Sequence, residues 1–300
     1  MHGDVSAGIA PGTPSDDELL AGARRGDAAA LEALLVRYQP RLFRFGLRMC
    51  GNEDEAGDVA QESLIAMARA VPQFRGDASL ATWLYTIARR VCIRQRRRSR
   101  FAPQRPESLD GPGVDAAHRV ADPAPNPERA AESREIEAAL AAAIAGLEDG
   151  QREVLVLRDV EGLPAAEVAR VLGIRVVAVK SRLHRARVAV RNRLAPLLGG
   201  PAADTPRLPG CPDVMPLFSR YLEGDIDSAV CARMAAHVAQ CDRCRGACDT
   251  LKRSLAVCRQ FPEAPLPASL ATAVKAAVRA FLAGQTGGGR GRRPGSQAAI

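Results

Sequence analysis

The feature that most constrains the fold is the stretch Asp54–Arg100, where apolar residues recur at helical spacing beside a dense run of arginines. The apolar residues lie three and four positions apart and are Trp83, Leu84, Ile87 and Val91. No carboxylate occurs between Asp77 and Glu107, whereas seven arginines occur within Arg89–Arg100. This pattern predicts a helix that buries one face and keeps a basic face in water, where it can neutralise phosphates.

The composition favours helices throughout the chain. Hydrophobic residues make up 47% of the 300 residues but aromatic residues only 4%, so the cores are built mainly from leucine, valine and alanine. A chain of this length can form two or three small domains. We therefore predict an all-α protein with two small helical domains and a further small helical domain rich in cysteine.

The net charge of +8 and the pI near 9.4 indicate a polyanionic partner such as nucleic acid. No apolar run is long enough to span a bilayer, and the polar N-terminus lacks a signal-peptide pattern. We expect a cytoplasmic protein with no membrane contact, whose eight cysteines are reduced or bind metal. Six of these cysteines follow residue 210, which assigns them to one domain.

Breaks in the apolar pattern divide the chain. Ser15 is the predicted N-cap of the first helix, and Pro72 is expected to end the third. Segments rich in proline and glycine predict linkers, and segments without periodicity predict disorder. The predicted division is residues 1–15 disordered, 16–100 the first domain, 101–131 a linker, 132–198 the second domain, 199–209 a linker, 210–260 the cysteine-rich domain, and 261–300 a C-terminal helix with a disordered tail.

The second domain contains a helix-turn-helix pattern. A short helix, Ala165–Leu172, is followed by a turn at Gly173 and by a basic helix, Val176–Leu198. No acidic residue occurs between Glu167 and Asp204. A solvated basic face is the plain alternative, but the complete absence of acids favours DNA contact.

Three motifs of the first domain occur together: Asp58-Val59-Ala60-Gln61-Glu62, Phe74-Arg75-Gly76-Asp77, and Thr82-Trp83-Leu84-Tyr85-Thr86-Ile87-Ala88-Arg89. In this order and spacing they resemble region 2 of the extracytoplasmic-function sigma factors, the small promoter-recognition subunits of bacterial RNA polymerase. The resemblance implies that Asp58, Gln61 and Glu62, which share one helix face, bind core RNA polymerase. From the residues alone, an ordinary solvated face is the alternative.

The same resemblance assigns the Trp83 helix and the loop before it to the promoter −10 strand, with an extruded base held by stacking and edge contacts. A core tryptophan beneath a solvated arginine edge is compatible with this interpretation. The DNA-binding residues implied here are Phe74, Arg75, Trp83, Tyr85, Arg89, Arg90 and Arg94. Arg90 and Arg94 stand where the family commonly has Asn and Asp, which leaves the −10 sequence preference open.

The segment Val179–Arg187 resembles region 4 of that family, whose pattern is T-V-K-S-R-L-x-R-A-R, with Ala178 in place of the usual threonine. The resemblance implies that this helix reads the −35 element in the major groove. The DNA-binding residues implied here are Arg175, Lys180, Ser181, Arg182, Arg185 and Arg187.

The spacing His237-x3-Cys241-x2-Cys244 puts three metal ligands on two helical turns, and Cys211 lies 25 intervening residues upstream. Reduced cysteines packed in a helical hairpin are the alternative, which a histidine in this register disfavours. The pattern resembles the anti-sigma zinc-finger domains. That resemblance gives Cys211, His237, Cys241 and Cys244 as ligands of one structural or sensory zinc ion per chain.

The other cysteines leave alternatives open. Cys248 could exchange with a ligand or form a disulfide, Cys231 could replace Cys211, and Cys258 has no assigned role. Cys50 and Cys92 are expected in an apolar core.

These patterns predict a sigma factor, not an enzyme, that initiates transcription by binding core RNA polymerase and promoter DNA. The zinc domain is predicted to regulate it through intramolecular contact with the sigma regions. A helix-turn-helix regulator with a metal- or redox-sensing domain is the alternative, but it leaves the region Phe74–Tyr85 without a role. A zinc hydrolase or thiol oxidoreductase is disfavoured. The four ligands leave no open position on the metal, and no His–Glu or Ser–His arrangement accompanies them.

Overall fold

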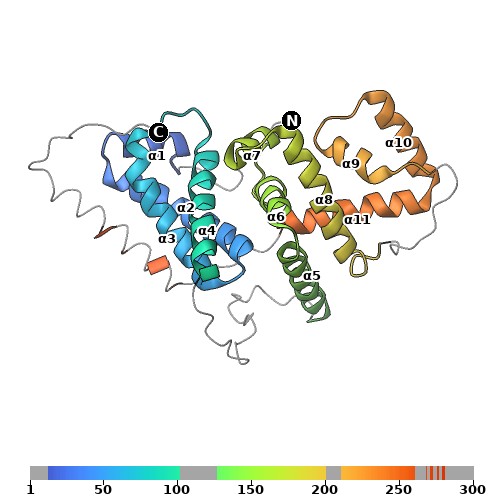
Figure 1. Cartoon of the computed structure of the whole chain (residues 1–300), viewed down its shortest axis with the longest axis horizontal. Coiled ribbons are helices and arrows are strands. Elements are labelled where there is room, and N and C mark those ends of the chain that lie inside the picture. Colours follow the sequence, from blue (N-terminus) through green and yellow to red (C-terminus); the bar gives the residue numbers. More distant parts are fainter. Residues whose placement is uncertain are drawn as a thin grey trace, which may run out of the picture.

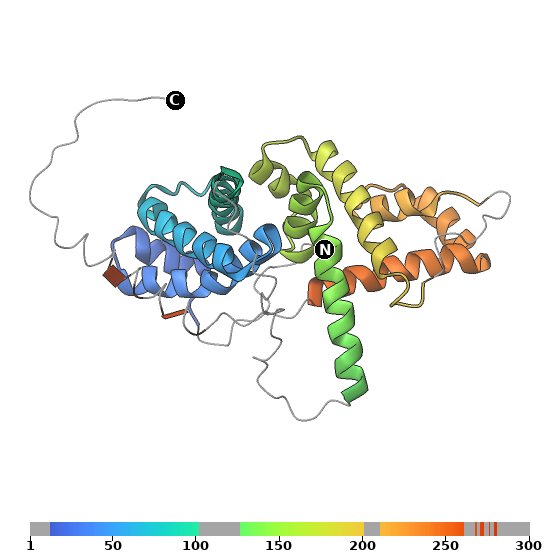
Figure 2. The same cartoon turned by 60° about the horizontal axis from the view of Figure 1, so that its bottom comes forward.

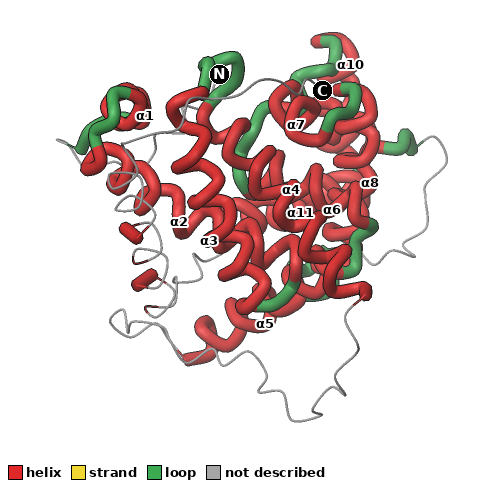
Figure 3. The backbone as a smooth tube through the Cα atoms, turned by 60° about the vertical axis from the view of Figure 1, so that its left-hand side comes forward, coloured by secondary structure: helices red, strands yellow, loops and turns green. Residues whose placement is uncertain are grey.

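The computed structural model describes residues 13–101, 127–200 and 211–260, with isolated positions between 268 and 280. Within these ranges the chain consists of helices and loops with no strand, which confirms the predicted all-α class (Figure 3). None of the helices in these ranges has the length and apolar character needed to cross a membrane. The segment predicted to be disordered, both predicted linkers and the predicted tail lie wholly or mostly outside the described residues.

Four α-helices build the first domain (Figure 1). They are α1 (Asp16–Arg24), α2 (Ala28–Cys50), α3 (Glu53–Ala70) and α4 (Leu80–Phe101). The N-cap predicted at Ser15 is confirmed: its hydroxyl accepts a hydrogen bond from the Glu18 amide (3.2 Å), and the Glu18 carboxylate accepts one from the Ser15 amide (2.7 Å). Pro72 ends α3 as predicted, in a 3-10 turn, η1 (Val71–Gln73).

The close approach of α2 and α3 depends on Gly46. A Cβ atom at this position would lie 2.9 Å from the Cα of Ala56, a distance that real side chains do not tolerate. The tight contact turns Val59 and Leu64 of α3 inward, where both are fully buried. Asp58 is consequently left exposed on the outer side of α3.

The second domain also has four α-helices and one π-helical turn. They are α5 (Pro127–Ala145), α6 (Asp149–Leu155), η2 (Val156–Val160), α7 (Ala165–Leu172) and α8 (Val176–Leu194). The helix-turn-helix is confirmed, with Gly173 in the left-handed conformation (φ 66°) at the end of α7. Two boundaries differ from the prediction. The first helix begins at Pro127, within the predicted linker, because proline is tolerated in the first helical turn. The basic helix α8 ends at Leu194, four residues early, in a turn.

Three helices form the third domain: α9 (Val214–Leu222), α10 (Ser228–Gln240) and α11 (Asp242–Gln260). Aspartates cap the first two of them. Asp213 accepts a hydrogen bond from the amide of Met215, and Asp227 accepts one from the amide of Ala229.

The three domains lie in a row, with the second in the middle (Figures 1 and 2). The first two share one continuous apolar core, to which Leu84 and Leu157 contribute. In this shared core α4 packs against α7, and α2 packs against α5. The third domain has its own small core around Phe218 and Leu251. Helix α11 joins the two cores, because Cys258 near its end is fully buried in the shared one.

Candidate nucleic-acid interface and metal centre

The four predicted metal ligands converge at one point of the third domain. The Sγ atom of Cys211 lies 3.6 Å from that of Cys241 and 3.7 Å from that of Cys244. The Nε2 atom of His237 lies 3.7 Å from the Cys211 sulfur and 3.2 Å from the Cys244 sulfur. Ligands about 2.3 Å from a tetrahedral zinc ion have sulfur atoms about 3.8 Å apart, so this donor set fits a closed site.

The fold places each ligand at a helix end. Cys211 precedes α9, His237 lies in the last turn of α10, Cys241 lies between α10 and α11, and Cys244 lies in the first turn of α11. All four ligand atoms lie within 4.8 Å of one another, and no other cysteine belongs to the cluster in the described part of the chain. Soft thiolate and imidazole donors in this number suit zinc or a similar soft metal.

The predicted polymerase-binding residues lie together on α3. Asp58 is exposed, and Gln61 and Glu62 are half-buried beside it. The Glu62 carboxylate forms an ion pair with Arg94 of α4, so one acid of this face already contacts the arginine-rich helix. Their role in binding polymerase stays a prediction.

The loop before α4 holds an aromatic pair. Phe74, which is buried, packs against Trp83 with ring centroids 4.9 Å apart and an angle of 45° between the rings. Arg75 is exposed, and Gly76 takes a left-handed conformation (φ 82°) that turns the loop toward α4. In this arrangement Phe74 covers part of the Trp83 ring.

Tyr85, predicted to contact DNA, is buried between the first two domains. Its side chain is 1% exposed, its ring lies 5.3 Å from that of Phe45, and its hydroxyl donates a hydrogen bond to Glu161. Burial and the adjacent Glu161 carboxylate raise the pKa of Tyr85 well above its usual value. The same carboxylate forms an ion pair with Arg48 (3.4 Å), and both side chains are nearly fully buried.

Further acids of the second domain lie along α4. The Glu153 carboxylate accepts two hydrogen bonds from Arg89, at 2.8 and 3.3 Å. Glu167 accepts hydrogen bonds from the hydroxyls of Ser79 and Thr82. Arg90 and Arg94 are exposed on the same helix. The second domain therefore covers one side of the helix predicted to meet the −10 strand.

The predicted DNA-binding residues of α8 and its N-cap, Arg175, divide into three groups. Arg175, Ser181 and Arg185 are exposed. Arg182 is half-buried beside Gly150 of α6, where a Cβ on the glycine would lie 3.1 Å from an Arg182 nitrogen. Lys180 and Arg187 contact acidic residues.

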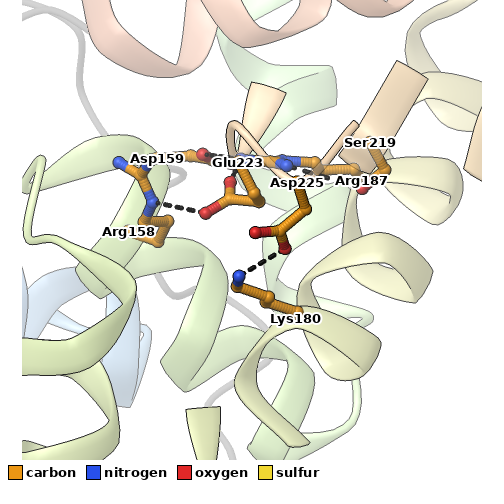
Figure 4. A network of polar contacts seen from close by, with 7 residues as sticks. All are labelled: Arg158, Asp159, Lys180, Arg187, Ser219, Glu223 and Asp225. Carbon is orange, nitrogen blue, oxygen red and sulfur yellow. Dashed lines mark hydrogen bonds and ion pairs between the residues drawn. The ribbon is translucent and has the colours of Figure 1, made fainter. Parts of the chain in front are cut away.

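Lys180 and Arg187 belong to a polar network that joins the second and third domains (Figure 4). Arg187 is buried at 2% exposure and donates to both carboxylate oxygens of Asp159, at 2.7 and 2.8 Å. It also donates to Glu223 at the end of α9 (2.7 Å), which pairs with Arg158 (3.1 Å) as well. Burial alone would lower the pKa of Arg187, but the two carboxylates raise it, so the guanidinium stays charged.

Sequence reasoning found the basic residues of this surface but missed their acidic partners. Glu153 and Glu167 lie on α6 and α7, and Glu161 follows η2 directly; in the sequence none of the three differs from an ordinary solvated residue. The only signal was the distribution of charge: carboxylates are absent between Glu167 and Asp204, a stretch that includes all of α8, and reappear on both sides of it in the sequence.

Three family models match the chain in succession. The model described as "Sigma-70 region 2" matches residues 34–101, "Sigma-70, region 4" matches residues 137–190, and "Putative zinc-finger" matches residues 211–245. The matched ranges correspond to the three domains of the structure.

Curated relatives match this chain over a length close to that of its first two domains combined. The RNA polymerase sigma-H factor of Pseudomonas aeruginosa is 37% identical over 188 residues, which is 61% of this chain and 95% of that protein. The ECF RNA polymerase sigma-E factor of Salmonella typhimurium is 33% identical over 192 residues, 61% of this chain and 96% of that protein. A solved structure titled as CnrH in complex with the cytosolic domain of CnrY is 28% identical, with a TM-score of 0.42, and the match covers 63% of this chain and 99% of that one.

Proposed function

The chain belongs to the extracytoplasmic-function sigma factors of RNA polymerase, and from this premise we propose which of its surfaces bind polymerase and promoter and how its third domain controls them. Sigma factors bind core RNA polymerase and promoter DNA, and this chain carries both regions that define the family. The observation that carries the assignment is the succession of both regions in a chain that spans 95% of a relative's length. The protein acts where polymerase and promoter are, in the cytoplasm, by binding and without covalent catalysis.

The polymerase-binding surface is the outer face of α3. Asp58 is exposed there, and Gln61 and Glu62 lie on the next turn of the same face. Carboxylates on this face repel phosphates, which supports a protein partner for α3 and a nucleic-acid partner for the basic helices.

The promoter-binding surfaces are the loop before α4, α4 itself and α8. Arg75 is exposed in the loop before α4 and Arg90 on α4 itself. Ser181 and Arg185 are exposed on α8, and Arg175 is exposed at its N-cap. An arginine on a recognition helix can contact phosphates or donate two hydrogen bonds to a guanine edge. Some residues of these two surfaces contact another domain: α4 contacts the second domain, and α8 contacts the third. These residues can bind DNA only when the domains separate.

The third domain binds one zinc ion through Cys211, His237, Cys241 and Cys244. The convergence of these four donors supports the proposal. With four protein ligands the site has no open position for a substrate, so the metal stabilises the domain.

The third domain controls the sigma regions in cis. Its helices α9 and α11 pack directly against α8, and residues 201–210 connect the two domains within one chain. A covalent tether raises the effective concentration to roughly millimolar, so even a weak contact is populated. A purely structural zinc domain would leave promoter binding unchanged when the contact is broken.

Paired substitutions test the assignment of surfaces. Asp58→Ala/Gln61→Ala should weaken binding to core polymerase by about tenfold or more and leave promoter affinity intact, because that face meets protein. Arg175→Ala/Arg185→Ala should lower promoter affinity and leave core binding intact, because removing an arginine that binds DNA costs about 1–3 kcal/mol of binding free energy. Fluorescence anisotropy with labelled core polymerase and labelled promoter DNA measures both, and the reverse pattern would contradict the assignment.

A further inference from the structure

A short acidic turn of the third domain contacts the basic helix α8. It comprises Glu223, Gly224 and Asp225, directly after α9, and we refer to it as the acidic turn (Figure 4). The Glu223 side chain is 4% exposed. Asp225 forms an ion pair with Lys180 of α8, and both of these side chains are about one-third exposed.

The buried part of this contact is charge-balanced only when the third domain is in place. The second domain contributes two guanidinium groups, Arg158 and Arg187, but only one carboxylate, Asp159. Glu223 supplies the second carboxylate, at 2.7 Å from Arg187 and 3.1 Å from Arg158. Without the third domain, the second domain would present two guanidinium groups against one carboxylate on a surface that the third domain no longer covers, and this excess of positive charge attracts another anion.

The anion that this position fits is a phosphate. Arginine binds carboxylates and phosphates with the same planar, two-pronged donor geometry, and lysine contacts either as a point charge. Lys180 and Arg187 lie on the recognition helix of the helix-turn-helix, where the DNA backbone passes.

We propose that the acidic turn mimics the phosphate backbone, and that it competes with promoter DNA for Lys180, Arg187 and Arg158. The inference rests on the proposed function of α8 and names the contact by which the third domain controls it. Arg175, Ser181 and Arg185 stay exposed, so the turn blocks one flank of α8 and leaves the other accessible. The docked form consequently binds promoter DNA weakly, and full affinity requires the turn to leave.

Competition predicts how affinity changes when the turn is neutralised. The apparent dissociation constant equals the intrinsic one divided by the fraction of molecules in the open state. Glu223→Gln/Asp225→Asn keeps the shape of the turn but removes both charges. It should raise the promoter affinity of the full-length protein by about tenfold or more, because an open fraction below a tenth becomes the majority.

The matched control is Asp249→Asn, which neutralises an acid of the same domain. Asp249 forms an ion pair with Lys252 of its own helix, and among the described residues it forms no ion pair with α8. The promoter affinity of this variant should equal that of the unaltered protein. Metal content and helical circular dichroism, equal in all three proteins, show that the third domain remains folded.

Lysine footprinting tests the contact without DNA. The chain has three lysines, Lys180, Lys252 and Lys275, so a mass spectrum resolves the modification of each. In the unaltered protein Lys180 should react with an acylating reagent several-fold more slowly than in Glu223→Gln/Asp225→Asn, while Lys252 should react equally in both. Asp225→Asn alone should speed the reaction of Lys180 even if the double variant loses its fold.

The outcomes separate this inference from the function on which it rests. If neutralising the turn changes neither promoter affinity nor Lys180 reactivity, while Arg175→Ala/Arg185→Ala still lowers affinity, the mimicry is wrong and the promoter-binding role of α8 stands. If the arginine substitutions also have no effect, the assignment of α8 itself is wrong, and the mimicry falls with it.

Discussion

Glu161 contacts two residues of the first domain in the closed arrangement. It accepts the Tyr85 hydroxyl hydrogen bond and pairs with Arg48, and all these side chains are almost completely buried. Buried ion pairs contribute little net stability compared with apolar packing, but the loss of one partner is costly because the other charge stays buried. Glu161 therefore holds the first two domains together by a contact that is sensitive to single substitutions.

Glu161→Gln should lower the free energy of unfolding by about 3 kcal/mol, because the buried ion pair between Glu161 and Arg48 is lost. Urea unfolding followed by the fluorescence of Trp83, the only tryptophan, measures the change. Glu53→Gln, at an exposed position on α3, is the control and should change stability by less than about 0.5 kcal/mol. Equal midpoints for the two variants would show that the Glu161 contacts do not hold the domains together.

Cys258 reports on the same junction. Burial raises the pKa of its thiol to about 12, so almost no thiolate forms at pH 8. Iodoacetamide should therefore modify Cys258 slowly in the free protein and faster once core polymerase separates the domains. Cys231, half-buried and outside the metal cluster, should be modified early under both conditions. Rapid modification of Cys258 in the folded, free protein would contradict its position in the shared core.

At the scale of elements, α11 links the metal centre to the sigma regions. Its first turn carries Cys244, while Cys258 near its last turn is buried in the core shared by the first two domains. Because both ends of α11 are held by contacts, we expect a displacement of its first turn to disturb the packing of its last turn.

Cys244→Ala should abolish stoichiometric zinc binding and also increase the alkylation of Cys258, because α11 loses its anchor. The first two domains should keep their helical content, since their core is largely independent of α9 and α10. Cys231→Ala is the matched control and should retain about one zinc ion per chain by elemental analysis. A Cys244→Ala protein that still binds zinc would remove Cys244 from the ligand set.

The elements also show what the sequence could predict. The spacing of His237, Cys241 and Cys244 predicted the metal cluster, and Cys211 required a family pattern. The predicted placement of the three on two turns of one helix was wrong, because the helix breaks at Cys241, between α10 and α11. The helix-turn-helix followed from a glycine between two periodic segments. The closure of the domains could not be predicted, because Tyr85 and Glu161 are 76 residues apart and neither interrupts a helical pattern. The same limit explains why the burial of Arg187 against Asp159, 28 residues away in the sequence, could not be predicted.

At the scale of the whole molecule, the structure is a closed arrangement of a sigma factor. Carboxylates of the second domain form ion pairs with α4, and carboxylates of the third domain form ion pairs with α8. Each basic helix therefore contacts acidic residues of another domain of the same chain. We expect the binding of polymerase and promoter to replace both sets of contacts. The net positive charge of the chain then favours the phosphate partner once the domains separate.

The most direct test of the account is promoter-dependent transcription by core RNA polymerase reconstituted with the purified full-length protein. We expect no specific transcript from core polymerase alone, a modest amount with the unaltered protein, and several-fold more with Glu223→Gln/Asp225→Asn. Asp58→Ala/Gln61→Ala should reduce the transcript to the level of core polymerase alone. If the full-length protein and the variant with the neutralised turn both bind core polymerase but support no initiation at any promoter selected from genomic DNA, the account is contradicted.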